Sequence, residues 1–473
     1  MSAVIPNPLV LKEENRPLPQ ILQRRKYESS EGVVSGGSIA KIFIPSGRNQ
    51  FINGKNSWLN FTLQGNLEGT NLPTTANGGD NTYRIKLDPM GLTQAIKKIT
   101  VRNGAGGNTI YELDNYAKAV SMLSVAEANA TTSNVRALTS NNAYITSGQF
   151  SALIGSSLYR IGPLRDDQKS PDGTYVKTAS YSASIPLLGI LGNCNIPISY
   201  ITEGLEISVE FERDVNQLFY IGDSTQPPLA NQSTLTGGTL TFSEISYEGS
   251  VSTLDDASMK EVESVNKFKS SPVMWTDSYH ILHNRTFTSD ELETAQDVNV
   301  IVPSLRFTSL NAIYHACFQM KQASNLSSYP LGVPHIGINK IRYRIGGVEH
   351  PRSYVDSLSK MVQNTMGCYT NVNQSSVGGL MSSSNTTLNY RPPLDANPSV
   401  VKNFTDRGVV AVNFECFPDI DSIAGLDTTH VDCECQFGLD GSGANSQNLD
   451  FWWMGCLDVV YVLEDGQLRR SFN

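Results

Sequence analysis

The chain contains 473 residues, of which 36 are basic and 45 are acidic, giving a formal net charge of −9. Charged residues make up only 17% of it, below the roughly 25% of an average soluble protein. The 39% of hydrophobic residues excludes a chain that is disordered throughout, and the lack of an apolar run of about 18 residues excludes a membrane-spanning helix. So few charges favour surfaces covered by other chains, or loops rich in Asn, Ser, Thr and Gly.

Residues 1–30 are predicted to form an extended N-terminal arm. Prolines, which disfavour helices and sheet ladders, recur in it at Pro6, Pro8, Pro17 and Pro19. Residues 1–13 lack the basic and apolar parts of a signal peptide, so we expect synthesis inside the cell without one. The arm carries a basic cluster that is a candidate contact with a neighbouring subunit, an acidic partner or nucleic acid, with a solvated segment as the alternative: Arg24, Arg25 and Lys26.

From about residue 37 the pattern becomes β. Short runs of apolar and aromatic residues, separated by Gly, Asn and Pro, predict strands at 39–44, 58–64, 95–102, 109–113, 181–188, 205–212 and 238–247. Residues 115–130 are the clearest helix, because Tyr116, Ala119, Val120 and Leu123 recur with helical spacing. These elements predict a first β body over residues 31–251.

Residues 252–269 are predicted to be a short amphipathic helix that joins two bodies, since they form the only charge-dense stretch of the middle chain. After this joint the β pattern restarts, with strands expected at 278–287, 298–302, 312–320, 338–345, 408–417, 431–437 and 452–463. The long polar stretch 370–398 is predicted to be an exposed loop of the second β body, residues 270–473. Alternating βα units are absent, so the fold class is all-β rather than parallel α/β.

The seven cysteines give little sign of a disulfide framework, because their number is odd and the chain is long. Cys433 and Cys435 are two residues apart, a spacing that places both sulfurs on one face of a strand. A pair of zinc ligands is one interpretation, but no second pair accompanies them. Small buried strand residues are the favoured interpretation.

Two kinds of side-chain pair are candidates for catalysis or metal binding: histidine pairs and carboxylate pairs. His280 and His283 are three residues apart, so on a strand they face opposite sides. The carboxylate pairs occur at a predicted helix start and in a turn, at Asp255-Asp256 and at Asp419 and Asp421. General acid–base work needs two carboxylates that face one pocket, and nothing in the pattern indicates one. We therefore predict no enzyme activity, no catalytic residues, no cofactor and no metal site.

Seven segments, in order along nearly the whole chain, resemble double jelly-roll major capsid proteins of small eukaryotic double-stranded DNA viruses, the polinton-like virus and virophage group. The most telling is 185–211, in which Pro-Leu is followed by small residues, a further Pro and an alternating strand. The other segments are 51–63, 99–116, 242–265, 343–351, 422–429 and 459–466. One departure is Ala424-Gly425, where the family has Ser-Gly.

The resemblance implies two eight-stranded antiparallel jelly-roll sandwiches in tandem, with short inserted helices and long loops. It also implies a homotrimer with a pseudo-hexagonal outline, which packs with other trimers into the icosahedral shell of a virion around a double-stranded DNA genome. Penton and minor capsid proteins would be further partners. Sequence-specific binding of nucleic acid is not implied. The resemblance is compatible with virions that have an internal membrane and with virions that have none.

Two other classes of function remain as alternatives. A secreted or surface β-sandwich protein could bind glycans, with Trp452 and Trp453 stacking on sugars. A β-rich hydrolase could use the carboxylate pairs. The ordered resemblance over both halves favours the capsid protein.

Overall fold

The computed structural model describes residues 20–70, 83–87, 91–124, 160–162, 175–223, 234–266, 272–302, 307–319, 338–356, 360, 363–364, 368, 410–414, 425–440 and 449–471. The predicted polar loop 370–398, together with Cys416, Asp419 and Asp421, lies outside these residues.

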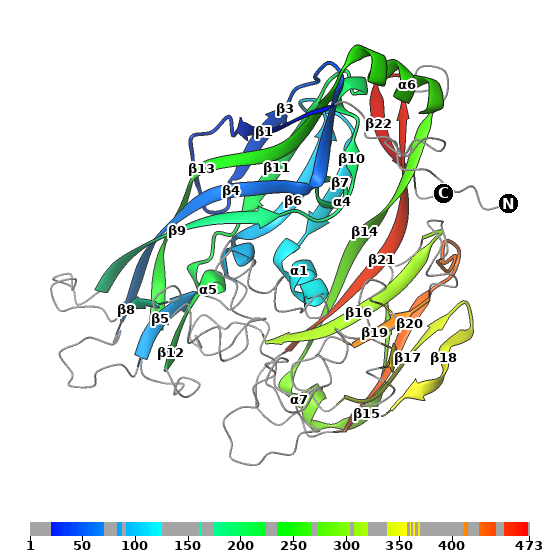
Figure 1. Ribbon diagram of the computed structural model, residues 1–473. Helices are drawn as coiled ribbons and strands as arrows, with labels where there is room; N and C mark the ends of the chain where they lie inside the picture. Colours follow the sequence, from blue (N-terminus) through cyan, green and yellow to red (C-terminus); the bar gives the residue numbers. More distant parts are fainter. Residues whose placement is uncertain are drawn as a thin grey trace, which may run out of the picture.

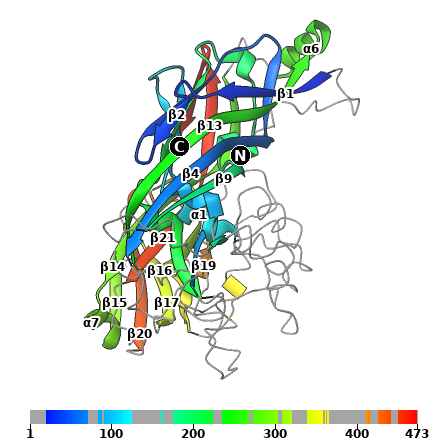
Figure 2. The same ribbon diagram turned by 90° about the vertical axis from the view of Figure 1, so that its left-hand side faces the viewer.

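The first β body is a sandwich of two antiparallel sheets (Figure 1). One sheet contains β1 (Gln20–Glu28), β2 (Val33–Ser35), β4 (Gln50–Thr70), β9 (Tyr175–Pro186), β10 (Asn195–Ile196) and β13 (Thr234–Leu254). The other contains β3 (Ile39–Ile44), β6 (Ile96–Asn103), β7 (Thr109–Asp114) and β11 (Leu205–Phe211). Figure 2 shows β13, β4 and β9 face-on. A small third sheet is formed by β5 (Tyr83–Leu87), β8 (Arg160–Gly162) and β12 (Phe219–Asp223).

The second β body repeats this arrangement. Its first sheet contains β14 (Val273–Phe287), β16 (Leu310–Gln319), β19 (Val410–Asn413), β21 (Leu449–Glu464) and β22 (Gln467–Ser471). Its second sheet contains β15 (Ala295–Ile301), β17 (Ile338–Ile345), β18 (Val348–Val355) and β20 (Cys433–Asp440).

The order of the strands defines a jelly roll in each sandwich. The first sheet of the second body runs β14-β21-β16-β19 and the other runs β15-β20-β17-β18. Successive strands lie in opposite sheets except for the hairpins β17-β18 and β21-β22, and the long strands β14 and β21 pair. In the first body, β1 pairs with β13, β4 with β13 and β9, and β3-β11-β6-β7 forms the facing sheet. The predicted all-β, double jelly-roll class is therefore confirmed.

Burial explains why these segments are strands. Along β3, Ala40, Ile42 and Ile44 are buried and alternate with exposed Ile39, Lys41 and Phe43, as expected of a strand with one face in a core. By contrast, β1 occupies residues that the sequence places in the extended arm. It pairs with β13 over its whole length, from Gln20 opposite Leu254 to Glu28 opposite Ser246.

Short helices fill the ends and the space between the sandwiches. They are η2 (Gly91–Ala95), α1 (Tyr116–Ser124), α4 (Ile190–Asn193), η4 (Ile198–Tyr200), α5 (Val215–Leu218), α6 (Asp256–Asn266) and α7 (Ser289–Glu293). Within the described chain, none of these is long and apolar enough to cross a membrane. α1 lies between the two sandwiches and α6 lies at the end of the molecule where they meet (Figure 1).

Candidate functional site

Cys433 and Cys435 lie on β20 with both side chains fully buried in the second sandwich. Burial raises the pKa of Cys435 to about 12, so its sulfur stays a thiol, whereas zinc binds the thiolate. Among the residues that the structure describes, no three His, Cys, Asp or Glu side chains come together as metal ligands would. The two thiols are packing groups of the core.

The histidine pair does not converge on a common site. His280 is 4% exposed, and its burial lowers its pKa to about 4. His283 is half-buried, and burial lowers its pKa as well. A third histidine, His315, had no signal in the sequence. It lies in the second core, with its Nδ1 3.1 Å from the Tyr343 hydroxyl and its ring stacked on Phe451.

Asp255 and Asp256 mark the start of α6. The carboxylate of Asp255 accepts a hydrogen bond of 2.7 Å from the backbone N–H of Ser258, which satisfies an otherwise unpaired amide of the first turn. Asp256 accepts a hydrogen bond of 2.7 Å from Asn49 and pairs with Arg48 at 2.9 Å. These contacts hold the pKa of both carboxyls below its usual range. Asp255 thus caps α6, and Asp256 makes an exposed contact with the turn that precedes β4.

The adjacent tryptophans of β21 are not displayed for a sugar. Trp453 is fully buried in the second core and Trp452 is 6% exposed. The ammonium of Lys118, on α1, lies 3.9 Å from the centre of the Trp452 ring. The observation that motivated a glycan-binding function is thus absent from the folded chain.

The three basic residues of the predicted arm lie on β1, and each has a partner in its own sandwich. Arg24 lies 3.6 Å from Glu248, Arg25 donates a 3.1 Å hydrogen bond to Gln50, and Lys26 lies 2.9 Å from Glu28. Among the described strands, β1 pairs only with β13 and is an edge strand of its sheet. Charged residues, Lys above all, protect such an edge against unwanted pairing.

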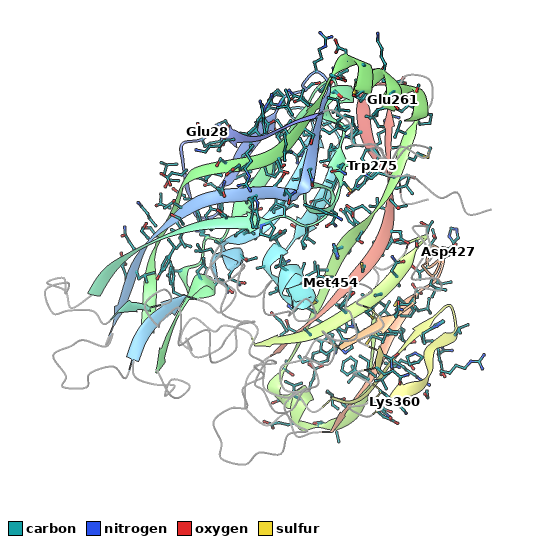
Figure 3. The ribbon with its side chains drawn as sticks, in the orientation of Figure 1. Glu28, Glu261, Trp275, Lys360, Asp427 and Met454 are labelled. Carbon is teal, nitrogen blue, oxygen red and sulfur yellow. The ribbon has the colours of Figure 1, made fainter. Side chains whose placement is uncertain are left out.

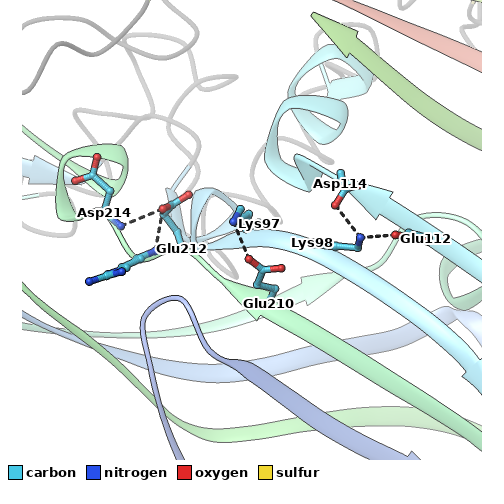
Figure 4. Close-up of polar contacts among 8 residues, drawn as sticks. Lys97, Lys98, Glu112, Asp114, Glu210, Glu212 and Asp214 are labelled. Carbon is cyan, nitrogen blue, oxygen red and sulfur yellow. Dashed lines mark hydrogen bonds and ion pairs between the residues drawn. The ribbon is translucent and has the colours of Figure 1, made fainter. Parts of the chain in front are cut away.

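Ion pairs also cover the outward faces of both sandwiches. On the first, Lys97 pairs with Glu210 at 2.7 Å, and Lys98 pairs with Glu112 and Asp114 (Figure 4). Glu212 nearby accepts hydrogen bonds from the backbone N–H groups of the two residues that follow it. On the second, Lys340 pairs with Asp297 at 2.9 Å and Arg342 pairs with Glu349 at 2.8 Å. On both described faces, basic side chains thus lie beside acidic partners.

The contact between the two sandwiches, which we call the seam, joins β6, β7, α1 and α4 of the first to β14, β21 and β22 of the second. The side chain of Asn103 accepts a hydrogen bond of 3.2 Å from the backbone N–H of Leu468 and donates one to its carbonyl. Next to it, the backbone N–H of Thr202 donates to the carbonyl of Gly466 at 2.9 Å. Buried apolar residues of both bodies form one continuous core. The two sandwiches therefore form a single packed unit.

No protein-family model matches the chain, and no curated protein sequence matches it. Solved structures do match. The Faustovirus major capsid protein is 10% identical, with a TM-score of 0.56, over 96% of this chain and 92% of that chain. The Sputnik virophage structure is 10% identical, with a TM-score of 0.56, over 99% of this chain and 93% of that chain. The mavirus major capsid protein is 10% identical, with a TM-score of 0.52, over 98% of this chain and 92% of that chain. The chain thus has the double jelly-roll fold of viral major capsid proteins.

Proposed function

We propose that this chain is the major capsid protein of an icosahedral double-stranded DNA virus. It is a structural protein rather than an enzyme, and it acts in the virion. The observation that carries this proposal is the match of both sandwiches, in one chain, to viral major capsid proteins over at least 92% of each compared chain. Fold alone does not determine function, but a double sandwich that is matched along its full length leaves little chain for another task.

The proposed assembly is a homotrimer with a pseudo-hexagonal outline, which contacts neighbouring trimers in a lattice. Two similar sandwiches per chain give six similar units per trimer, which suits hexagonal packing. Trimer formation is a closed contact, while the lattice needs heterologous contacts as well. The ion pairs on the outward faces would reduce like-charge repulsion where such faces approach other copies. Penton and minor capsid proteins would complete the shell, and β1 with its basic cluster would contact a neighbour or the interior.

Size-exclusion chromatography with light scattering tests the trimer. The expected mass is about 155 kDa, three times the chain mass of 51.6 kDa. Negative-stain microscopy of the same fraction should show three-fold particles with a hexagonal outline. A chain that stays monomeric at high concentration and forms no larger assembly would contradict the proposal.

A glycan array, probed with the same preparation, addresses the other class of function. We expect no binding, because both tryptophans of the Trp452-Trp453 pair are buried. Binding by a stable monomer would favour a β-sandwich lectin instead.

A further inference from the structure

The seam contains an unusual group of buried polar atoms. In the described part of the chain, four of these atoms have no partner other than the weakly hydrogen-bonding Cys194 thiol beside Trp275 and Asp277: Tyr111 Oη, Trp275 Nε1, Asp277 Oδ2 and Tyr461 Oη. Such atoms are rare in folded proteins, because each forfeits its hydrogen bonds to water. Here these atoms come from both sandwiches, so the lost hydrogen bonds to water weaken the contact between the sandwiches.

The four side chains lie close together. Trp275 and Tyr461 are opposite each other on β14 and β21, with ring centroids 5.9 Å apart. Asp277 is two residues from Trp275 and shares its face of β14. Burial raises the pKa of Tyr111 and of Tyr461, and the nearby charge of Asp277 raises both further. Figure 3 shows Trp275 near the seam.

Every element around Asp277 contributes a titratable or polar group. From the first sandwich these are Asn193, Cys194, Tyr111 and the exposed ammonium of Lys55 on β4. From the second they are Tyr461 and Tyr279, the latter hydrogen-bonded to Arg470. His280 is three residues along β14 and on its other face. Asn193 donates a hydrogen bond of 3.1 Å to Asp277 Oδ1.

The half-buried carboxylate of Asp277 is therefore well paired at Oδ1, whereas its buried Oδ2 has only the Cys194 thiol, a weak donor, beside it. A buried charge without a full set of partners is costly. Burial accordingly raises the pKa of Asp277 to about 6, despite the hydrogen bonds and the Lys55 charge that lower it. Protonation removes the charge and gives Oδ2 a hydrogen-bond donor.

We propose that Asp277 makes the seam pH-sensitive: protonation of this carboxyl relieves a charge whose buried oxygen is poorly paired, and tightens the contact between the two sandwiches. The direction follows from linkage. Separation of the sandwiches returns Asp277 to water, where it titrates near 3.8. The free-energy cost of the buried Asp277 charge to the closed seam is greatest above pH 6, and it falls as the pH decreases below 6. Between pH 7.5 and pH 5, the closed form gains about tenfold over the open one from this group alone.

Hydrogen–deuterium exchange of the full-length protein tests this, read at the peptides of β7 and β14 and corrected for the intrinsic pH dependence of exchange. Asp277→Asn keeps the shape of the side chain and cannot ionise. We expect its seam peptides to be better protected than those of the wild-type protein at pH 7.5, and this advantage to shrink about tenfold at pH 5. The histidines titrate in both proteins and cancel in the comparison. Light scattering at both pH values confirms that the oligomeric state is the same.

Asp297→Asn is the matched control, because Asp297 is exposed on β15 and pairs with Lys340 away from the seam. It should leave the seam peptides unchanged at both pH values. Lys55→Gln is a second variant that removes an exposed positive charge near Asp277. It should lower seam protection at pH 7.5 and leave it unchanged at pH 5. An effect of Asp277→Asn or Lys55→Gln that is the same at both pH values would overturn the proposal, whether or not the protein forms trimers.

Discussion

Tyr111 of the first sandwich and Tyr279 of the second pack edge to face, with ring centroids 5.3 Å apart. The hydroxyl of Tyr279 donates a hydrogen bond of 2.8 Å to the backbone carbonyl of Glu112 and accepts one of 2.6 Å from Arg470. One side chain thus connects β14 with β7 across the seam and with β22 of its own sandwich. The two sandwiches depend on each other through specific contacts as well as through shared apolar burial.

Replacing Tyr279 should weaken this connection in two separable steps. Tyr279→Phe keeps the ring and loses both hydrogen bonds, which we expect to cost about 1–2 kcal/mol. Tyr279→Ala also loses the buried ring and should cost about 3–5 kcal/mol. Urea unfolding followed by circular dichroism measures both. Equal losses for the two variants would show that the ring contact with Tyr111 contributes nothing.

The joint helix α6 should depend on its apolar face rather than on its ion pair. Val262 and Met259 are buried against Phe51 and Leu254, whereas Asp256 and Arg48 are exposed. Val262→Ala should destabilise the protein by about 2 kcal/mol through lost burial and a small cavity. Asp256→Ala should have a much smaller effect, because exposed ion pairs contribute little. Thermal melting of both variants checks this, and a larger loss for Asp256→Ala would contradict it.

His315 should make the second sandwich sensitive to acid. Its burial lowers its pKa to about 3, against about 6.5 in an unfolded chain. The fold therefore keeps this ring neutral, and the stability that depends on its neutrality is full above pH 6.5 and is lost as the pH falls toward 3. From pH 7 to pH 5 this group alone should cost about 2 kcal/mol.

His315→Phe should reduce that pH dependence, because phenylalanine can keep the stacking on Phe451 and does not titrate. Unfolding free energies of the two proteins at pH 5 and pH 7 make the comparison. The variant loses the contact with the Tyr343 hydroxyl, so its absolute stability will differ. Only the difference between the two pH values is diagnostic, and identical slopes would refute the assignment.

Within the N-terminal region, β1, which begins at Gln20, should contribute most of the stability. Deleting residues 1–30 removes β1, whose nine residues pair with β13. We expect a loss of several kcal/mol, since each cross-strand pair contributes roughly 0.2–1 kcal/mol, and aggregation through the exposed edge of β13. Deleting residues 1–19 keeps β1 and its pairing with β13, so we expect a smaller change in the melting midpoint than for the longer deletion. Light scattering and melting of the two truncations, compared side by side, test this; an unchanged midpoint for the longer deletion would show that β1 is dispensable.

Much of the fold could be predicted because it is written in local periodicity. The alternation of Ala40, Ile42 and Ile44 with exposed residues defines β3 without any knowledge of its neighbours. The helical spacing of Tyr116, Ala119 and Val120 likewise predicts α1. The burial of Cys433 and Cys435 on one face of a strand was likewise predictable, because side chains two residues apart on a strand point the same way. Where the pattern is weak, as in β1, the strand forms because β13 offers it a ladder of partners.

The sequence by itself determined the fold class of this protein: two β bodies and a short joint, all expressed in spacings of a few residues. Only the tertiary structure decided how the bodies meet. Tyr111 and Tyr279 are far apart in the chain, and neither has a local signal that marks it as a contact. Asp277 looks like any strand carboxylate until the first sandwich covers one of its oxygens. Its properties depend on burial and on partners brought from elsewhere in the chain, which no local pattern records.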